Sequence, residues 1–283
     1  MVGSFDCHIW PYSCEEDETR EGPNCFSPYS TVEVLDEGAI PMHDVKIGDS
    51  ILTASGAYES VYAFGHKDAN STTDFLRIFT DGYLHPLEVT AKHLVFVNST
   101  GGFSLVPAED IKEGDFLRST EGRATRVIDI RHIKRNGLYA PFTTDGTLVV
   151  DGIVASSYMS LKAIEYHKFF KNRIHKVSHL AVSPIRFVCT RLTSKLCELK
   201  NDDGIPYLFS YLEDYLNVAN NLWVPFHVAA IVLYLSLAMV FYVAEWLTSL
   251  DGIIMSISVA ATLLLQQWEK CHDISSEVVL ENE

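Results

Sequence analysis

The sequence predicts a domain of β-strands with two related halves, followed by a helical tail that holds one long apolar segment. Short runs of Val, Ile, Leu, Phe and Thr, cut by Gly, Asp and Asn, fill residues 31–158, and no helical period persists there. A six-residue pattern occurs twice in this region. After Leu161 the runs become longer and compatible with helices. These observations predict an all-β class for the first half and an α-helical class for the second.

The individual strands are predicted from apolar, β-branched segments bounded by turn residues. Such a segment is a better fit to a pleated, half-buried surface than to a helix. In chain order these segments read STVEVL, DSILTA, DFLRIFT, HLVFV, RVIDIRHI and TLVVDGIVAS.

The repeat consists of Asp44–Asp49 (DVKIGD) and Asp110–Asp115 (DIKEGD), at an offset of 66 residues. A strand-like segment follows each copy. Gly-Asp suits a tight turn, because Gly tolerates a positive φ and Asp bonds to nearby backbone. Two related β units therefore predict a fold with pseudo-twofold symmetry.

The tail contains Tyr215–Ala244, a stretch without Asp, Glu, Lys or Arg. A segment that crosses a bilayer needs about 20 apolar residues, and Trp223 and Trp246 bracket this one as interface aromatics do. A second apolar stretch, Gly252–Trp268, is shorter and contains hydroxyl residues. We expect the tail to associate with a membrane; the alternative is a buried helical hairpin of a soluble domain.

Charge and cysteine content exclude some classes of protein. The 283 residues are enough for one or two domains, and the net charge of −15 argues against a general nucleic-acid-binding protein. Six cysteines are too few for a disulfide scaffold, and Cys189, Cys197 and Cys271 are given no role. Residues 1–24 are acidic, whereas residues 160–200 are basic.

Targeting signals are sparse. The first 20 residues show neither a basic start nor an apolar run, so no signal peptide is visible. Asn70-Ser71-Thr72 and Asn98-Ser99-Thr100 have the form of N-glycosylation acceptors. They point weakly to a secretory route.

The residues with chemical potential are Cys25, Thr90 and His93. Cys25 stands where the β half begins, and Thr90 and His93, three positions apart, lead into an apolar strand. A thiol and a distant Thr-x-x-His could meet at one point in space. Taken alone they are weak evidence, since a single histidine is more often a satisfied core or surface residue.

Five motifs follow one another in the β half: CFSPYSTVEVL, DVKIGDSILTAS, LEVTAKHLVFV, DIKEGDFL and GLYAPFTTDGTLVVDGIVASSYM. In this order, the motifs resemble the Hint module, the self-cleaving domain shared by Hedgehog C-terminal (Hog) domains and inteins, and the Hog branch in particular. The resemblance covers residues 25–161 and implies a horseshoe-like, all-β Hint fold built from two pseudo-symmetric subdomains.

The resemblance implies a mechanism of protein autoprocessing. Cys25 attacks the carbonyl of Asn24 in an N-to-S acyl shift, and the amide becomes a thioester. His93 acts as a general acid on the leaving nitrogen, while Thr90 orients the bond and the imidazole. Because the thiolate is the reactive form, we expect neighbouring groups to activate Cys25. A second nucleophile then releases residues 1–24.

The second nucleophile is less clear. The β half ends without the Asn that splicing inteins need, so splicing is not expected. Ser157 stands where Hedgehog proteins carry a Cys, and His66 falls where they carry the Asp that activates a sterol hydroxyl. A neutral imidazole can also act as a general base, for water or another hydroxyl; Asp68 is the alternative for this role. An exposed loop histidine is the plain interpretation of His66.

The segment that follows resembles the sterol-recognition stretch of Hedgehog proteins, which makes a sterol the expected co-substrate. Its candidates for lipid recognition are His175, His179, Pro184 and Arg186. His175 and His179 have the spacing of a helical metal-ligand pair, but no third ligand is evident, so no metal is expected. The plain alternative is a helix that packs on the β domain.

The predicted organisation has four parts: an upstream segment to be released, which could be the end of a longer domain, the autoprocessing domain, a basic helical region and an apolar tail. The basic region favours a cytoplasmic side, whereas the resemblance favours the secretory pathway and the ER lumen, which we prefer. Such a domain acts once, on itself, without nucleic acid. The alternative function is a Hint scaffold that does not cleave and binds lipid at a membrane. In chain order, the upstream segment is 1–24, the autoprocessing domain 25–161, the basic helical region 162–212 and the apolar tail 213–283.

Overall fold

The computed structural model describes residues 25–99, 102–158, 174–202, 204–220 and 224–249, with positions 253, 257 and 258. Up to residue 158, this part of the chain is built of antiparallel strands, which confirms the expected all-β class. The strands form one eleven-stranded sheet in the order β10-β11-β6-β8-β9-β4-β3-β1-β2, with β5 paired to β4 and β7 paired to β6.

The strand bounds agree with the apolar segments of the sequence. Short helical turns η1 (Met42–Asp44), η2 (Ala108–Asp110) and η3 (Thr120–Gly122) lie between strands. The strands are β1 (Thr31–Val34), β2 (Gly38–Pro41), β3 (Ser50–Leu52), β4 (Tyr58–Thr80), β5 (Leu87–Val89), β6 (Leu94–Ser99), β7 (Gly102–Pro107), β8 (Phe116–Arg118), β9 (Ala124–Thr143), β10 (Thr147–Val150) and β11 (Ile153–Ser156).

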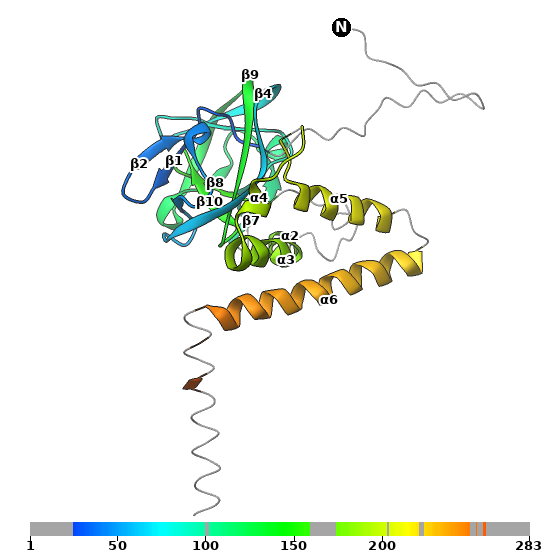
Figure 1. Ribbon diagram of the computed structural model, residues 1–283. Helices are drawn as coiled ribbons and strands as arrows, with labels where there is room; N and C mark the ends of the chain where they lie inside the picture. The colour runs from blue at the N-terminus through cyan, green and yellow to red at the C-terminus, as the bar shows by residue number, and fades with distance from the viewer. Residues whose placement is uncertain are drawn as a thin grey trace, which may run out of the picture.

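Two strands are much longer than the sequence suggests. β4 and β9 pair along most of their length, from Val61 opposite Thr143 to Thr80 opposite Val127. The polar residues between the apolar ends of β4 hide this continuity, and the pairing shifts register between Asp68 and Thr72. Because a β-bulge absorbs the irregularity, one long two-stranded ribbon connects the two halves of the domain (Figure 1).

The sequence repeat is also a structural repeat. In the first copy Gly48 N–H donates to the Val61 carbonyl at 2.8 Å, and Val61 N–H donates to the Asp49 carbonyl at 2.8 Å. Gly48 has φ +99° and Gly114, its equivalent, has φ +94°, a conformation that favours glycine. The same two bonds recur in the second copy with every residue number raised by 66, and both are again 2.8 Å long, from Gly114 to Val127 and from Val127 to Asp115. The two β units are therefore related, as predicted.

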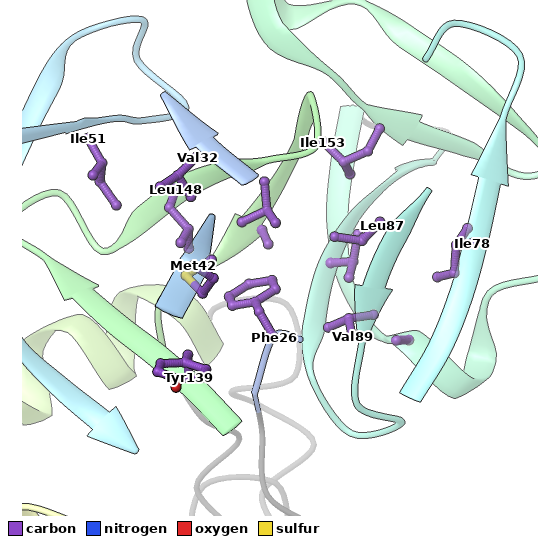
Figure 2. Close-up of a cluster of buried hydrophobic side chains, with 14 of the residues drawn as sticks. Phe26, Val32, Met42, Ile51, Ile78, Leu87, Val89, Tyr139, Leu148 and Ile153 are labelled. Carbon is purple, nitrogen blue, oxygen red and sulfur yellow. The ribbon is translucent and has the colours of Figure 1, made fainter. Parts of the chain in front are cut away.

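The main core lies where the two halves meet. Figure 2 shows the Phe26 ring inside this cluster of apolar side chains, beside Met42 and Val89. Phe26, Met42 and Val89 are fully buried. Burial of a Phe side chain contributes about 1.5–3 kcal/mol, so the core fixes the residue that follows Cys25.

A helical region packs against one end of the β domain. Figure 1 shows α6 running beneath α2 and α3, with the β domain on their other side. The helices are α2 (Ile174–Ala181), α3 (Ser183–Phe187), the π-helical turn η5 (Val188–Leu192), α4 (Lys195–Glu198), α5 (Tyr207–Asn220) and α6 (Val224–Thr248).

The helical region carries a disulfide that the sequence did not indicate. Cys189 and Cys197 are bonded, and both are buried in a second core with Tyr158 and Phe142. The expectation that these two cysteines have no role is wrong, since they bond to each other. A structural disulfide is typical of proteins that mature in an oxidising compartment.

Candidate functional site

Cys25 is placed by the residue that follows it. Phe26 forms an antiparallel bridge between Tyr139 of β9 and Val89 of β5. Phe26 N–H donates to the Tyr139 carbonyl at 2.8 Å, and Tyr139 N–H donates back at 3.2 Å. The chain therefore enters the domain as a short strand between two others, and Cys25 occupies a fixed position at its start.

Thr90 contacts the backbone on both sides of Cys25. Thr90 Oγ1 accepts a hydrogen bond from the Cys25 N–H at 2.9 Å, and Thr90 N–H donates to the Cys25 carbonyl at 3.0 Å. The N–H of Cys25 belongs to the peptide bond between Asn24 and Cys25. Thr90 therefore holds the nitrogen of the bond that is expected to break.

His93 lies one turn beyond Thr90 and is buried. Its N–H donates to the Thr90 carbonyl at 3.1 Å, and its ring centroid is 4.2 Å from that of Phe26. Nε2 is 3.0 Å from the Ser156 carbonyl oxygen. Because a carbonyl only accepts, the Nε2 proton is held in that bond, and Nδ1 is the ring nitrogen that can gain or give a proton.

The thiol of Cys25 is surrounded by apolar side chains. Cys25 is fully buried and clusters with Phe75, Leu138 and Ala140. Burial raises the pKa of the Cys25 thiol well above its usual range. Among the described residues no neighbouring group lowers this pKa, so the expected activation of Cys25 by its neighbours is not seen.

His66 and Asp68 lie on the face of β4 that carries the Cys25 cluster. His66 pairs with Ala140 and Asp68 pairs with Leu138 across the two long strands. Directly opposite residues of an antiparallel pair place their side chains on one face, and Ala140 and Leu138 both pack against Cys25. The Ser71 hydroxyl, by hydrogen bonding, lowers the pKa of Asp68 most, and His66 adds to the effect.

Ser157 points to a different group of residues. Its Oγ is 3.2 Å from Thr143 Oγ1, and its N–H donates to the Gly146 carbonyl at 2.9 Å. Ser157 is fully buried in this hydroxyl network. The geometry therefore does not favour Ser157 as a second nucleophile.

The candidates for lipid recognition form a polar network beside the β domain. His175 Nδ1 is 3.2 Å from Ser156 Oγ, and His179 Nδ1 is 2.7 Å from the Tyr158 hydroxyl. Arg186 Nη1 lies 3.2 Å from His179 Nδ1. Burial, and then Arg186, lower the pKa of His179 to about 3, so this imidazole stays neutral.

The fourth candidate, Pro184, stands in the first turn of α3, where proline costs a helix no hydrogen bond. The helix position alone accounts for a proline at residue 184, so no lipid contact is needed to explain it. Within the described ranges, no group of three metal-binding side chains is found.

The sequence prediction missed two polar groups near the site. The carbonyl of Ser156 fixes His93, and a backbone acceptor has no residue signature. Glu88 precedes Val89 in β5 and is buried, but Arg135 binds it through both carboxylate oxygens at 2.8 and 3.0 Å, and Arg77 lies at 3.2 Å. A charged residue in the middle of a short strand is a signal that basic side chains lie nearby.

Glu88→Gln tests this ion pair. Burial opposes ionisation of Glu88, yet hydrogen bonds from Arg135 and Ser27 and the charge of Arg77 hold its pKa below the usual value. We expect the substitution to lower the free energy of unfolding by about 1.5–3 kcal/mol at neutral pH. The stabilisation is present above the pKa of an unfolded Glu and is lost as the pH falls through the folded value.

Urea unfolding of both proteins across acidic pH measures this loss. Glu33→Gln, at an exposed position of β1, is the matched control. Equal stability of the Glu88 variant and the parent chain at neutral pH contradicts the assignment.

Comparisons with known proteins give one matching family and several relatives. The family model of the Hint module matches residues 15–208. The Tiggy-winkle hedgehog protein of Danio rerio is 27% identical over 216 residues, covering 70% of this chain and 49% of the relative. Protein hedgehog of Drosophila melanogaster is 30% identical over 178 residues, 59% of this chain and 35% of the relative.

Another relative is Protein qua-1 of Caenorhabditis elegans, 27% identical over 177 residues, which are 54% of this chain and 15% of that protein. The chain spans about half or less of the length of these curated relatives. Among solved structures, the gp41-1 intein aligns with 48% of this chain and 99% of its own, at 16% identity and a TM-score of 0.40.

Proposed function

Since the chain belongs to the Hint module family, we propose that it is an autoprocessing domain that cleaves the bond between Asn24 and Cys25 through a thioester. It acts on itself and turns over once. The upstream piece passes to water or to the hydroxyl of a lipid, of which a sterol is the first candidate.

The observation that carries the proposal is the hydrogen bond from the Cys25 N–H to Thr90 Oγ1 at 2.9 Å. It holds the amide nitrogen of the bond to be broken beside a buried thiol, and His93 is tied to the same Thr90 through its own N–H. The bond from the Thr90 N–H continues the strand pairing of Phe26 with Val89, whereas the bond to Thr90 Oγ1 needs a hydroxyl side chain at this position. This arrangement supports attack by the thiol at a fixed peptide bond.

The first step exchanges an amide for a thioester. The sulfur of Cys25 attacks the Asn24 carbonyl carbon, the new C–S bond forms, and the C–N bond breaks. The proton lost by the thiol is balanced by the proton that the leaving amine gains. His93 Nδ1, which carries no proton while Nε2 donates to the Ser156 carbonyl, takes up the thiol proton and delivers it to the leaving nitrogen. Amide resonance makes the exchange uphill, so the second step must consume the thioester as it forms, while orientation and proton transfer raise the rate.

The second step releases the upstream piece. A hydroxyl oxygen attacks the thioester carbonyl, the C–O bond forms, the C–S bond breaks, and the thiol of Cys25 regains its proton. His66 is the base we propose for this hydroxyl, since it shares a face of β4 with the residues packed on Cys25. Asp68 is the alternative base.

His66→Ala tests the second step separately. We expect release to water or sterol to slow about 10²-fold, because the acceptor loses its general base. Cleavage by dithiothreitol should persist, since that thiol attacks the thioester without the base. The measurement is the intact mass of a reporter fused ahead of Met1. The fusion is incubated with sterol in detergent micelles, with dithiothreitol, or with neither. Asp68→Asn is the matched variant.

A mass increase of the reporter only with sterol identifies a sterol transferase, whereas a free carboxylate identifies hydrolysis. Unchanged release from the His66 variant, together with slow release from the Asp68 variant, assigns the base to Asp68. If no addition releases the reporter, the second function stands, a non-cleaving Hint scaffold that binds lipid.

We further propose that the chain matures in the secretory pathway and works at a membrane. The disulfide between Cys189 and Cys197 supports an oxidising compartment. Asn70 and Asn98 are both exposed, as glycosylation acceptors must be. The segment Val228–Thr248 is long and apolar enough to enter a bilayer.

A further inference from the structure

Helix α6 is apolar without being a core helix. Its segment Val228–Thr248 has a mean hydropathy of 2.1, yet only 6% of its most apolar stretch is buried. Leu233 is 71% exposed and Val240 is 64% exposed. An apolar face of this size is unfavourable in water and indicates a surface that is covered in the working protein.

The other face of α6 is fastened to the helical region at three points. The Tyr234 hydroxyl donates to the Ala181 carbonyl at 2.7 Å, and the Ser183 hydroxyl donates to the Ala238 carbonyl at 2.6 Å. Near the end of the helix, Arg186 and Glu245 pair at 2.6 Å. At 1.5 Å per residue, these contacts extend over about 16 Å of the helix.

These contacts decide how α6 can meet a membrane. Ala238 is fully buried against the helical region and lies midway along Val228–Thr248. If α6 crossed a bilayer, Ala238 would lie at the centre of the hydrocarbon, and α3 and the nearby β domain would follow it there. Glu59 and Arg191, which line a cavity of about 650 Å³ between the β domain and the end of α6, would then lose their water, which is unfavourable for charged groups.

The exposed face of α6 suits lipid better than a protein partner. Its serine and threonine hydroxyl groups are satisfied within the helix, since Ser236 donates to the Val232 carbonyl and Thr248 to the Ala244 carbonyl, both at 2.8 Å. Within α6, no Asp, Glu, Lys or Arg occurs before Glu245. A face whose serine and threonine hydroxyls are paired and that holds no such charge can enter acyl chains, whereas water-facing protein interfaces keep a polar rim.

We propose that α6 lies in the plane of one membrane leaflet, with its exposed apolar face in the acyl chains and its opposite face holding the catalytic domain at the surface. This rests on the membrane association proposed above and not on cleavage. It differs from the sequence interpretation of a spanning segment, because both ends of α6 then lie on the same side of the bilayer. The domain reaches lipid hydroxyls from that side.

The test compares the two ends of α6 in the full chain. Cysteine is placed before the helix by Asp214→Cys and after it by Ser249→Cys, which lines the cavity on the domain side. Cys7, Cys14 and Cys271 are replaced by serine. Each protein is added to preformed phosphatidylcholine vesicles, recovered by flotation and treated with a membrane-impermeant maleimide.

We expect both cysteines to react to the same extent before and after detergent. Protection of Ser249→Cys until detergent is added means that α6 crosses the bilayer and overturns the proposal. Failure of the chain to float with vesicles overturns it as well, and so does recovery of the chain as a dimer that covers α6.

A second pair of variants tests the face. Leu237→Glu, on the exposed side of α6, should lower vesicle binding at least about tenfold, while Leu35→Glu, exposed on the β domain, should leave it unchanged. Equal binding of both variants contradicts the proposal. Cleavage by dithiothreitol is scored in the same samples, so loss of binding with intact cleavage separates the membrane contact from the autoprocessing function.

Discussion

Cys25→Ala will leave the bond between Asn24 and Cys25 intact in dithiothreitol, in sterol micelles and in buffer alone. The substitution removes the only atom that can form the thioester, and neither water nor a hydroxyl can reach the buried amide with comparable reactivity. We expect the rate to fall at least about 10⁴-fold. The measurement is the fraction of a reporter fusion released over time, separated by gel electrophoresis.

Cys271→Ala is the matched control, since it removes a thiol far along the chain from the proposed site. Cys25→Ser keeps a nucleophile of similar size and should retain slow cleavage through an ester. Release of the reporter from Cys25→Ala at the rate of the parent chain contradicts the proposed mechanism.

His93→Ala will lower the rate of cleavage in dithiothreitol by about 10²–10⁴-fold, the range for loss of a general acid. Without the imidazole, the leaving nitrogen gains no proton as the C–N bond breaks, and the tetrahedral intermediate returns to the amide. The Cys25 thiol remains in place, so the defect lies in the first step. Single-turnover kinetics of the reporter fusion measure it.

His132→Ala is the control, because His132 is an exposed histidine of β9. Urea unfolding of both variants separates a chemical defect from lost packing, since the His93 ring also contacts Phe26. Parent-like cleavage by a folded His93→Ala protein removes His93 from the mechanism.

The sequence predicts the repeat and the class of the β domain well, because local turn chemistry determines both. Gly48 and Gly114 have the positive φ that their Gly-Asp turns imply. The continuous pairing of β4 and β9 was not predictable, because a polar stretch and its bulge interrupt the alternation on which strand prediction depends. Pairing between distant segments is a tertiary property.

The candidate site also has a part that the sequence predicts and a part that it does not. Residue type and spacing are weak evidence for Cys25, Thr90 and His93, and the resemblance to the Hint module is what singles them out; the structure places Thr90 in contact with both Cys25 and His93. The Ser156 carbonyl could not be predicted, since a backbone oxygen is common to every residue. The disulfide of Cys189 and Cys197 was missed because short helices separate the two cysteines and hide their proximity.

For α6, length and composition predict a membrane-competent segment, and the structure describes such a helix. Its contacts through Tyr234, Ala238 and Glu245 depend on the shape of the surface that α2 and α3 form. The hydrophobic periodicity of the sequence does not reveal that shape. The one charged residue near its end, Glu245, appears in the sequence as the boundary of an apolar segment and in the structure as the partner of Arg186.

The most direct test of the central claim is the mass of the new carboxyl terminus after cleavage in dithiothreitol. We expect a released piece that ends at Asn24 and carries one dithiothreitol as a thioester, which hydroxylamine converts to a hydroxamate. The same peptide must be absent from the Cys25→Ala protein. A terminus at any other residue, or no released piece under any condition, contradicts the account and leaves the domain as a scaffold.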